Sequence, residues 1–147
     1  MEHEEYMRQA LELARLAMAE GEVPVGCVIV RDGAVVGRGR NRRETAQTAL
    51  GHAELEAIAQ ACRTLGGWRL AGCALYVTLE PCPMCAGAIV NARIPAVYYG
   101  AKDDKAGCCG SVLNLFEERF NHHPRIYGRV LEAECAALLQ KFFQSLR

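Results

Sequence analysis

The stretch EPCPMC, residues 80–85, is the part of the sequence from which the fold can be worked out. An apolar, strand-like run precedes it, and the run AGAIV, residues 86–90, follows it in a pattern typical of a helix. Pro83 suits the first turn of a helix, where an N–H would have no partner in any case. Cysteines three positions apart on a helical turn share one face, so Cys82 and Cys85 can point at one object. We therefore predict a strand–helix junction whose helix N-terminus favours thiolates.

Paired thiolates bind zinc or form a redox couple, and the spacing of Cys82 and Cys85 does not decide between these. The stretch HAE, residues 52–54, adds the missing information. Catalytic zinc keeps three protein ligands and one open position for water, so His52 can join the two cysteines as the third ligand. Glu54 is then left beside the metal as a carboxylate that can move protons. H-x-E followed by P-C-x-x-C is the signature of zinc-dependent nucleobase deaminases, whereas the aromatic-Cys-Gly-Pro-Cys context of a thioredoxin-like pair is absent.

The spacing of His52 and Glu54 restricts where they can share a site. Residues at i and i+2 point to different sides of a continuous helix. We therefore expect a helix to start at His52, with this side chain reaching past the helix end.

Composition is that of an ordinary globular enzyme. The 147 residues predict a single domain, 1–147, and the 51% apolar and 23% charged residues fit this class. The formal net charge of +0 excludes a global positive field, so any contact to nucleic acid must depend on a local basic patch. The acidic start, residues 1–5, lacks the apolar core of a signal peptide, and no apolar run approaches the ~20 residues of a membrane span.

The eight cysteines do not predict a disulfide framework. Several lie in apolar strand-like or helical runs, as buried reduced cysteines do: Cys27, Cys62, Cys73 and Cys135. We therefore expect a reducing, cytoplasmic environment.

Periodicity and turn residues predict helices alternating with strands. Asp32-Gly33 is a two-residue hairpin signal, and residues 101–111 form a polar loop. The predicted helices cover 3–20, 52–66, the CxxC segment to about 92, 112–120 and 131–146. The predicted strands cover 25–31, 34–39, 73–79, 96–100 and 126–130. This order favours a mixed five-stranded sheet flanked by helices, with both motifs opening helices at one sheet edge.

From end to end, the chain resembles the bacterial tRNA-specific adenosine deaminases. Besides the two motifs, the matching segments are 21–26, 40–42, 79–88, 100–103, 110–111, 121–122, 134–135 and 142–143. The chain departs from the family pattern at Leu50-Gly51, where Thr-Ala is common, and at Cys108-Cys109, where small residues without thiols are usual. The resemblance implies an α/β protein with the three-layer α/β/α cytidine-deaminase-like fold, and a homodimer.

The resemblance also implies the reaction, hydrolytic deamination of adenosine to inosine at the wobble position of a tRNA anticodon stem-loop. One Zn²⁺ per chain would be held by His52, Cys82 and Cys85. Glu54 would move protons from the attacking water to the adenine ring nitrogen and to the departing amine. The base would be splayed out of its stack to enter the pocket.

The implied substrate contacts fall into two groups. Hydrogen bonds and pocket walls would come from Asn41, Asn121, Ala53, Pro81 and the backbone of Cys82. Phosphates would be held by Arg38, Arg40, Arg42, Arg43, Lys102 and Lys105.

Other readings stay open. The enzyme could instead act on a free base or nucleoside, such as guanine or cytosine, or the chain could be a structural zinc module that only binds RNA. A structural zinc site is usually closed by four protein ligands, and three are visible here. Asn41 could simply end a strand and Asn121 could simply belong to a loop, since asparagine is common in both places. An arginine cluster such as 38–43 is often a solvated face.

Overall fold

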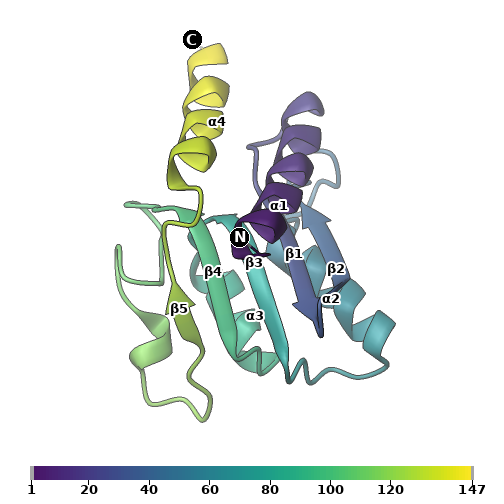
Figure 1. The fold of residues 1–147 in the computed structure, drawn as a ribbon. Coiled ribbons are helices and arrows are strands. Elements are labelled where there is room, and N and C mark those ends of the chain that lie inside the picture. Colours follow the sequence, from purple (N-terminus) through teal and green to yellow (C-terminus); the bar gives the residue numbers. More distant parts are fainter. Residues whose placement is uncertain (1, 147) are drawn as a thin grey trace.

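The computed structural model describes residues 2–146, which form one five-stranded sheet and the helices around it (Figure 1). The helices are α1 (Glu2–Ala19), α2 (Ala53–Leu65), α3 (Pro83–Asn91) and α4 (Glu132–Ser145), with a 3-10 turn, η1 (Leu115–Glu117). The strands are β1 (Gly26–Arg31), β2 (Ala34–Arg40), β3 (Cys73–Leu79), β4 (Ala96–Ala101) and β5 (Arg125–Tyr127).

The sheet has the strand order β2-β1-β3-β4-β5 and is mixed, as predicted. β1 pairs antiparallel with both β2 and β3, whereas β3, β4 and β5 run parallel. The predicted hairpin joins β1 to β2, and its two residues Asp32 and Gly33 both have positive φ, 51° and 77°, as the tight turn requires. The helix α3 connects the parallel strands β3 and β4, which need such a crossover.

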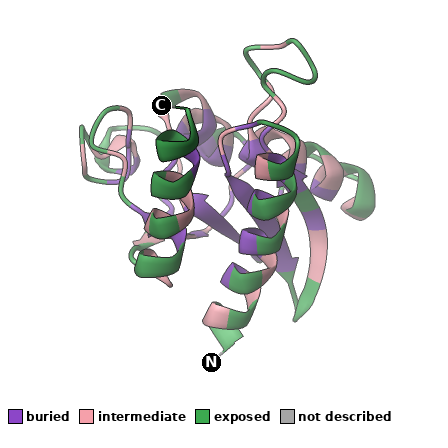
Figure 2. Ribbon diagram, turned by 90° about the horizontal axis from the view of Figure 1, so that it is seen from above, coloured by how far each residue is buried: buried purple, intermediate pink, exposed green. Residues whose placement is uncertain are grey.

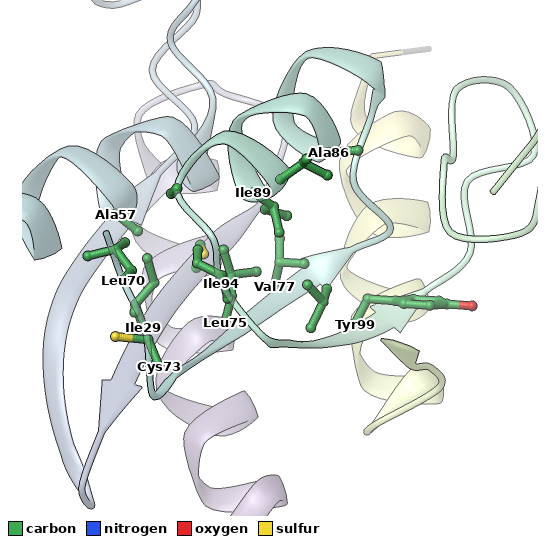
Figure 3. Close-up of a cluster of buried hydrophobic side chains, with 14 of the residues drawn as sticks. Ile29, Ala57, Leu70, Cys73, Leu75, Val77, Ala86, Ile89, Ile94 and Tyr99 are labelled. Atoms are coloured by element: carbon green, nitrogen blue, oxygen red, sulfur yellow. The ribbon is translucent and has the colours of Figure 1, made fainter. Parts of the chain in front are cut away.

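Helices cover both faces of the sheet, so the architecture is the expected three-layer α/β/α fold. α1 and α4 lie in front of the sheet in Figure 1, and α2 and α3 lie behind it. Successive strand residues point to opposite faces, so Ile29 and Leu75 pack toward α2 and α3, whereas Val28 and Tyr76 pack toward α1. Figure 3 shows the core on the α2/α3 side. Exposed residues gather on the outer sides of the helices and in the loops (Figure 2).

Small residues bring α2 unusually close to β2. A Cβ at Gly39 would overlap the backbone carbonyl of Ala53, and one at Gly37 would overlap that of Ala57. Only glycine fits at these two strand positions, and the alanines of α2 keep the facing surface flat. This contact fixes the start of α2 and with it the position of His52.

Two predicted elements differ from the structure. The helix predicted over 112–120 is wrong, because only η1 forms there and Phe116 is the single buried apolar side chain. The backbone of this segment bonds instead to the preceding loop, through Val112 N–H to Gly107 O and Leu115 N–H to Cys108 O. The last strand ends at Tyr127 rather than at residue 130, since Arg129 takes positive φ and turns the chain toward α4.

No helix within residues 2–146 combines the length and the apolar character needed to cross a membrane.

Candidate active site

Two helix starts meet at the carboxyl end of β3. His52 immediately precedes α2, and Cys82 immediately precedes α3. Both residues have extended backbones, with φ and ψ of −95° and 148° for His52 and −78° and 174° for Cys82. Neither side chain caps its own helix by a hydrogen bond, so each is free to point at a ligand. His52 lies just outside the helix, and in this way it shares the site with Glu54.

Three metal-ligand atoms converge at this point. The Nδ1 atom of His52 lies 3.6 Å from Sγ of Cys82 and 3.5 Å from Sγ of Cys85. Zn–S and Zn–N bonds of about 2.3 and 2.0–2.1 Å at a tetrahedral angle place sulfur and nitrogen about 3.5–3.6 Å apart. The spacing therefore fits one tetrahedral zinc ion, and its soft thiolate and imidazole donors are those that zinc prefers. Within residues 2–146, no fourth His, Cys, Asp or Glu joins this group, as expected for a site with an open position.

The two thiols differ in the direction of their pKa shifts. Hydrogen bonds from Cys85 and His52 lower the pKa of Cys82 to about 4. The hydrogen bond to Cys82, together with burial, raises the pKa of Cys85. The hydrogen bond to Cys82 also raises the pKa of His52. Zinc binds cysteine as the thiolate, so the lowered pKa of Cys82 favours binding, and a metal ion would displace the proton of Cys85.

Glu54 is a buried carboxyl group beside this cluster. Its side chain belongs to the second residue of α2 and is 4% exposed. Burial raises the pKa of Glu54 to about 7, so the group can both accept and donate a proton near neutral pH. An acid–base catalyst works best when its pKa is close to the working pH.

A cavity of about 250 Å³ opens onto these groups. This volume lies below the ~300–1,000 Å³ of pockets for drug-sized ligands. The cavity therefore suits one flat base rather than several nucleotides. Its lining comes from four segments: Val23 and Val25; Asn41, Arg43 and His52–Glu54; Leu79, Glu80 and Cys82; Asp103 and Ala106.

The structure brings some of the predicted substrate residues to this cavity. Asn41, Arg43 and Ala53 line it. Pro81 is buried beside it, and its carbonyl oxygen accepts a hydrogen bond from Cys108 N–H at 2.8 Å. Asn121 does not reach the cavity, because it lines a separate hollow over α3.

The predicted basic residues are unequally available. Arg40 forms two hydrogen bonds to Glu20, at 2.9 and 3.0 Å, and Arg42 lies 3.0 Å from a carboxylate oxygen of Glu56. Within the described chain, the exposed side chain of Arg43 makes no ion pair. The same holds for the exposed side chains of Arg38, Lys102 and Lys105.

Two buried glutamates beside the cavity were not predicted from the sequence. Glu22, 1% exposed, accepts hydrogen bonds from the N–H groups of Glu44 and Thr45. Glu80, 2% exposed, accepts hydrogen bonds from the segment 102–111, which we call the pocket loop. For Glu80, the available signal was an acidic residue directly after an apolar strand, because a buried carboxylate requires partners. Glu22 follows α1 and Gly21 and offered no such signal.

Known proteins resemble this chain over nearly its full length. The family model of the MafB19-like deaminases matches residues 1–147. The tRNA-specific adenosine deaminase of Bacillus subtilis (strain 168) is 51% identical over 143 residues, which are 97% of this chain and 89% of that protein. That of Agrobacterium fabrum is 45% identical over 147 residues, covering 99% of this chain and 97% of the relative.

Solved structures give the same result. A tRNA:A34 deaminase, studied for A-to-I editing at the wobble position of transfer RNA, superposes with a TM-score of 0.88 at 44% identity, covering 91% of this chain and 98% of the other. A guanine deaminase from Bacillus subtilis superposes with a TM-score of 0.68 at 35% identity, covering 100% of this chain and 94% of the other. Sequence identity over almost the whole length and the shared fold show that this chain belongs to the tRNA-specific adenosine deaminase family, within the MafB19-like deaminases.

Proposed function

We propose that this protein is a zinc-dependent hydrolase that converts adenosine to inosine at the wobble position of a tRNA anticodon, with one Zn²⁺ per chain. The observation that carries this proposal is the convergence of three ligand atoms beside a buried carboxyl group in a cavity of the size of one base. The names of the relatives at 45–51% identity support adenosine in tRNA as the substrate.

Glu54 carries the proton transfers in this mechanism. Zinc held by His52, Cys82 and Cys85 would supply the Lewis acid that makes water nucleophilic near neutral pH. The carboxylate of Glu54 takes a proton from the attacking water and passes it to the ring nitrogen next to C6. Glu54 then takes the second proton of the water, from the hydroxyl group now on C6, and gives it to the departing amine, so that adenosine and water give inosine and ammonia. The raised pKa of Glu54 suits both directions of transfer.

The rest of the anticodon would lie outside the cavity. Since the cavity suits a single base, the adenosine leaves its stack to enter it and the neighbouring nucleotides remain on the surface. Arg43 at the rim is the first candidate for a phosphate contact, and Lys102 is next to the lining residue Asp103. Asn41 and, over the α3 hollow, Asn121 are proposed to contact the nucleotides.

We also propose that the protein is a cytoplasmic homodimer. A hollow of about 530 Å³ over α3 has apolar lining from Leu55, Met84, Val90, Leu115 and Phe120, and Phe120 is 49% exposed. Exposed apolar surface of this kind is suited to burial against a second copy. All eight cysteines are free thiols, as in proteins of a reducing compartment.

The decisive experiment measures inosine formation in a minimal anticodon stem-loop with adenosine at the wobble position. Free adenosine, guanine and cytosine are the competing substrates, and each assay is repeated with a chelator and after zinc is restored. We expect fast, zinc-dependent deamination of the stem-loop alone. Full activity in the chelated protein would contradict the zinc mechanism.

Free guanine is the second candidate substrate, because a full-length guanine deaminase at 35% identity shares the fold. If guanine were deaminated faster than the stem-loop, the substrate would be the free base. The proposed roles of the metal site and of Glu54 would not change.

A further inference from the structure

We infer that Glu80 is a positioning residue, whose buried carboxylate holds the pocket loop in place as one wall of the substrate cavity. The inference deepens the proposed function, since it concerns how that cavity keeps its shape for the base. Glu80 follows β3 directly and stands two residues before Cys82. The loop residues Asp103 and Ala106 line the cavity together with His52 and Asn41.

Both carboxylate oxygens of Glu80 are used by the pocket loop. Oε1 accepts hydrogen bonds from Asp103 N–H at 3.1 Å and from the Ser111 hydroxyl at 2.5 Å. Oε2 accepts from Cys109 N–H at 2.9 Å and from Ser111 N–H at 3.1 Å. One side chain thus joins both ends of the loop to the end of β3.

These bonds resist opening of the loop. Among residues 2–146, no Lys, Arg or His forms an ion pair with Glu80, so its charge is satisfied by loop donors alone. If the loop moved away, the carboxylate of Glu80, which is 2% exposed in the closed loop, would lose these hydrogen bonds and would need water in their place. Hydrogen bonds to a charged group are roughly twice as strong as those between neutral groups, so this attachment is stronger than the neutral bonds of an ordinary loop.

Gly107 shows how tightly the loop is fitted around the carboxylate. A Cβ at this position would overlap the Glu80 carboxyl group and the backbone oxygen of Asp103. The loop therefore closes on Glu80 only because residue 107 has no side chain. Gly107→Ala must displace the same carboxylate that Glu80→Gln alters.

The test compares Glu80→Gln and Gly107→Ala with two controls, Glu117→Gln and Gly67→Ala. Glu117 is exposed, and a Cβ at Gly67 meets nothing within 4 Å. Glutamine keeps one acceptor oxygen but turns an NH₂ group toward the two N–H donors on Oε2. Each protein is analysed for zinc per chain, for hydrogen exchange of residues 102–111 by mass spectrometry, and for kcat and KM.

We expect both test variants to retain zinc and to exchange the pocket-loop amides about 10- to 100-fold faster, as the loss of one charged hydrogen bond predicts. KM should rise by a similar factor while kcat changes much less, because the wall binds the base without taking part in proton transfer. Both controls should match the wild type. The double variant should be no worse than the poorer single variant, since both changes break one attachment.

Unchanged exchange of the pocket loop in Glu80→Gln would overturn the inference, and so would loss of zinc, which would make Glu80 a support of the metal site. Additive effects in the double variant would also overturn it. Gly107→Ala gives the same readout if Glu80→Gln fails to fold. Hydrogen exchange needs no substrate, and KM is measured with whichever substrate the wild type accepts, so failure of the tRNA proposal is seen separately.

Discussion

The side-chain amide of Asn41 donates a hydrogen bond to the backbone oxygen of Val23, with 3.1 Å between nitrogen and oxygen. The other end of the same side chain accepts a hydrogen bond from Arg43 N–H, also at 3.1 Å. Asn41 therefore links two segments of the cavity lining through a side chain that is 8% exposed. A substrate contact by Asn41 has to be made from this fixed position.

Replacing Asn41 by alanine should reduce catalysis more than binding. Loss of two neutral hydrogen bonds, about 1 kcal/mol each, shifts the lining and predicts a roughly 10- to 30-fold slower single-turnover rate on the stem-loop. The salt dependence of binding should stay unchanged, because a neutral side chain releases no counterions. A flatter salt slope in Asn41→Ala would show that the substitution disturbs a phosphate contact instead.

Glu54→Ala should retain the fold and the zinc but lose the chemical step. Acid–base groups are typically worth ~10²–10⁴ in rate, and Glu54 serves several transfers, so the loss should reach or exceed the top of this range. The measurement is kcat on the stem-loop together with zinc content and thermal unfolding. More than about a tenth of wild-type turnover in Glu54→Ala would remove this residue from the mechanism.

Cys82→Ser should lose both zinc and activity. Protein purified without added metal should contain about one zinc per chain by elemental analysis, and serine replaces a thiolate with a much weaker ligand. Cys62→Ser is the matched control, because Cys62 is half-buried on α2 and lies outside the ligand group. If Cys82→Ser lost zinc and still deaminated the stem-loop, the metal would have no catalytic role.

The strands and the ligand cluster were predictable because their signals are local. The strand over Cys73–Leu79 was predicted with both ends correct, since an apolar, β-branched run there is bounded by Gly72 and by Glu80-Pro81. The meeting of His52 with the two cysteines followed from the motif and from the helix starts that the motif implies.

What the sequence left open depends on contacts between distant residues. Glu22 and Glu80 accept hydrogen bonds from backbone amides 22 to 31 positions away. No periodic pattern in the sequence indicates such distant partners. The close approach of α2 to β2 required knowing that Gly39 faces Ala53. The helix predicted over 112–120 failed because its apolar residues, such as Val112, do not share a buried face.

Glu22 should make the stability of the protein dependent on pH in the acid range. Burial opposes ionisation, but hydrogen bonds from Thr45 and Glu44 outweigh it and lower the pKa of Glu22 below its ordinary value of 4.5. A carboxyl group with a lowered folded pKa stabilises the fold above the unfolded pKa, and this contribution is lost as pH falls through the folded pKa. Glu22→Gln should therefore melt at a lower temperature than the wild type at pH 7.

The difference in melting temperature between the wild type and Glu22→Gln should shrink as the pH falls below about 4.5. Thermal unfolding of both proteins from pH 3 to 7 checks this, with Glu12→Gln as a control, because Glu12 is exposed on α1. A constant difference over the whole range would mean that the charge of Glu22 does not contribute.

Binding of the stem-loop should depend on the arginines around Asn41, and most of all on Arg43. The formal net charge of +0 confines the attraction to local contacts. Within residues 2–146, Arg43 forms no ion pair that it would have to break. Arg40 and Arg42 must first separate from Glu20 and Glu56, although exposed pairs are worth only about 0–1 kcal/mol.

Replacing Arg40, Arg42 and Arg43 together by alanine should weaken adenosine and inosine stem-loops alike and flatten the salt slope by up to ~1 per lost phosphate contact. Arg43→Ala alone should account for the largest single part of that change. Arg63→Ala, in the last turn of α2 and far from the site, is the control and should bind normally. Normal binding by the triple variant at every salt concentration would place the RNA elsewhere on the surface. Lys102 and Lys105 on the pocket loop would then be the next residues to replace, because both are exposed beside the same cavity.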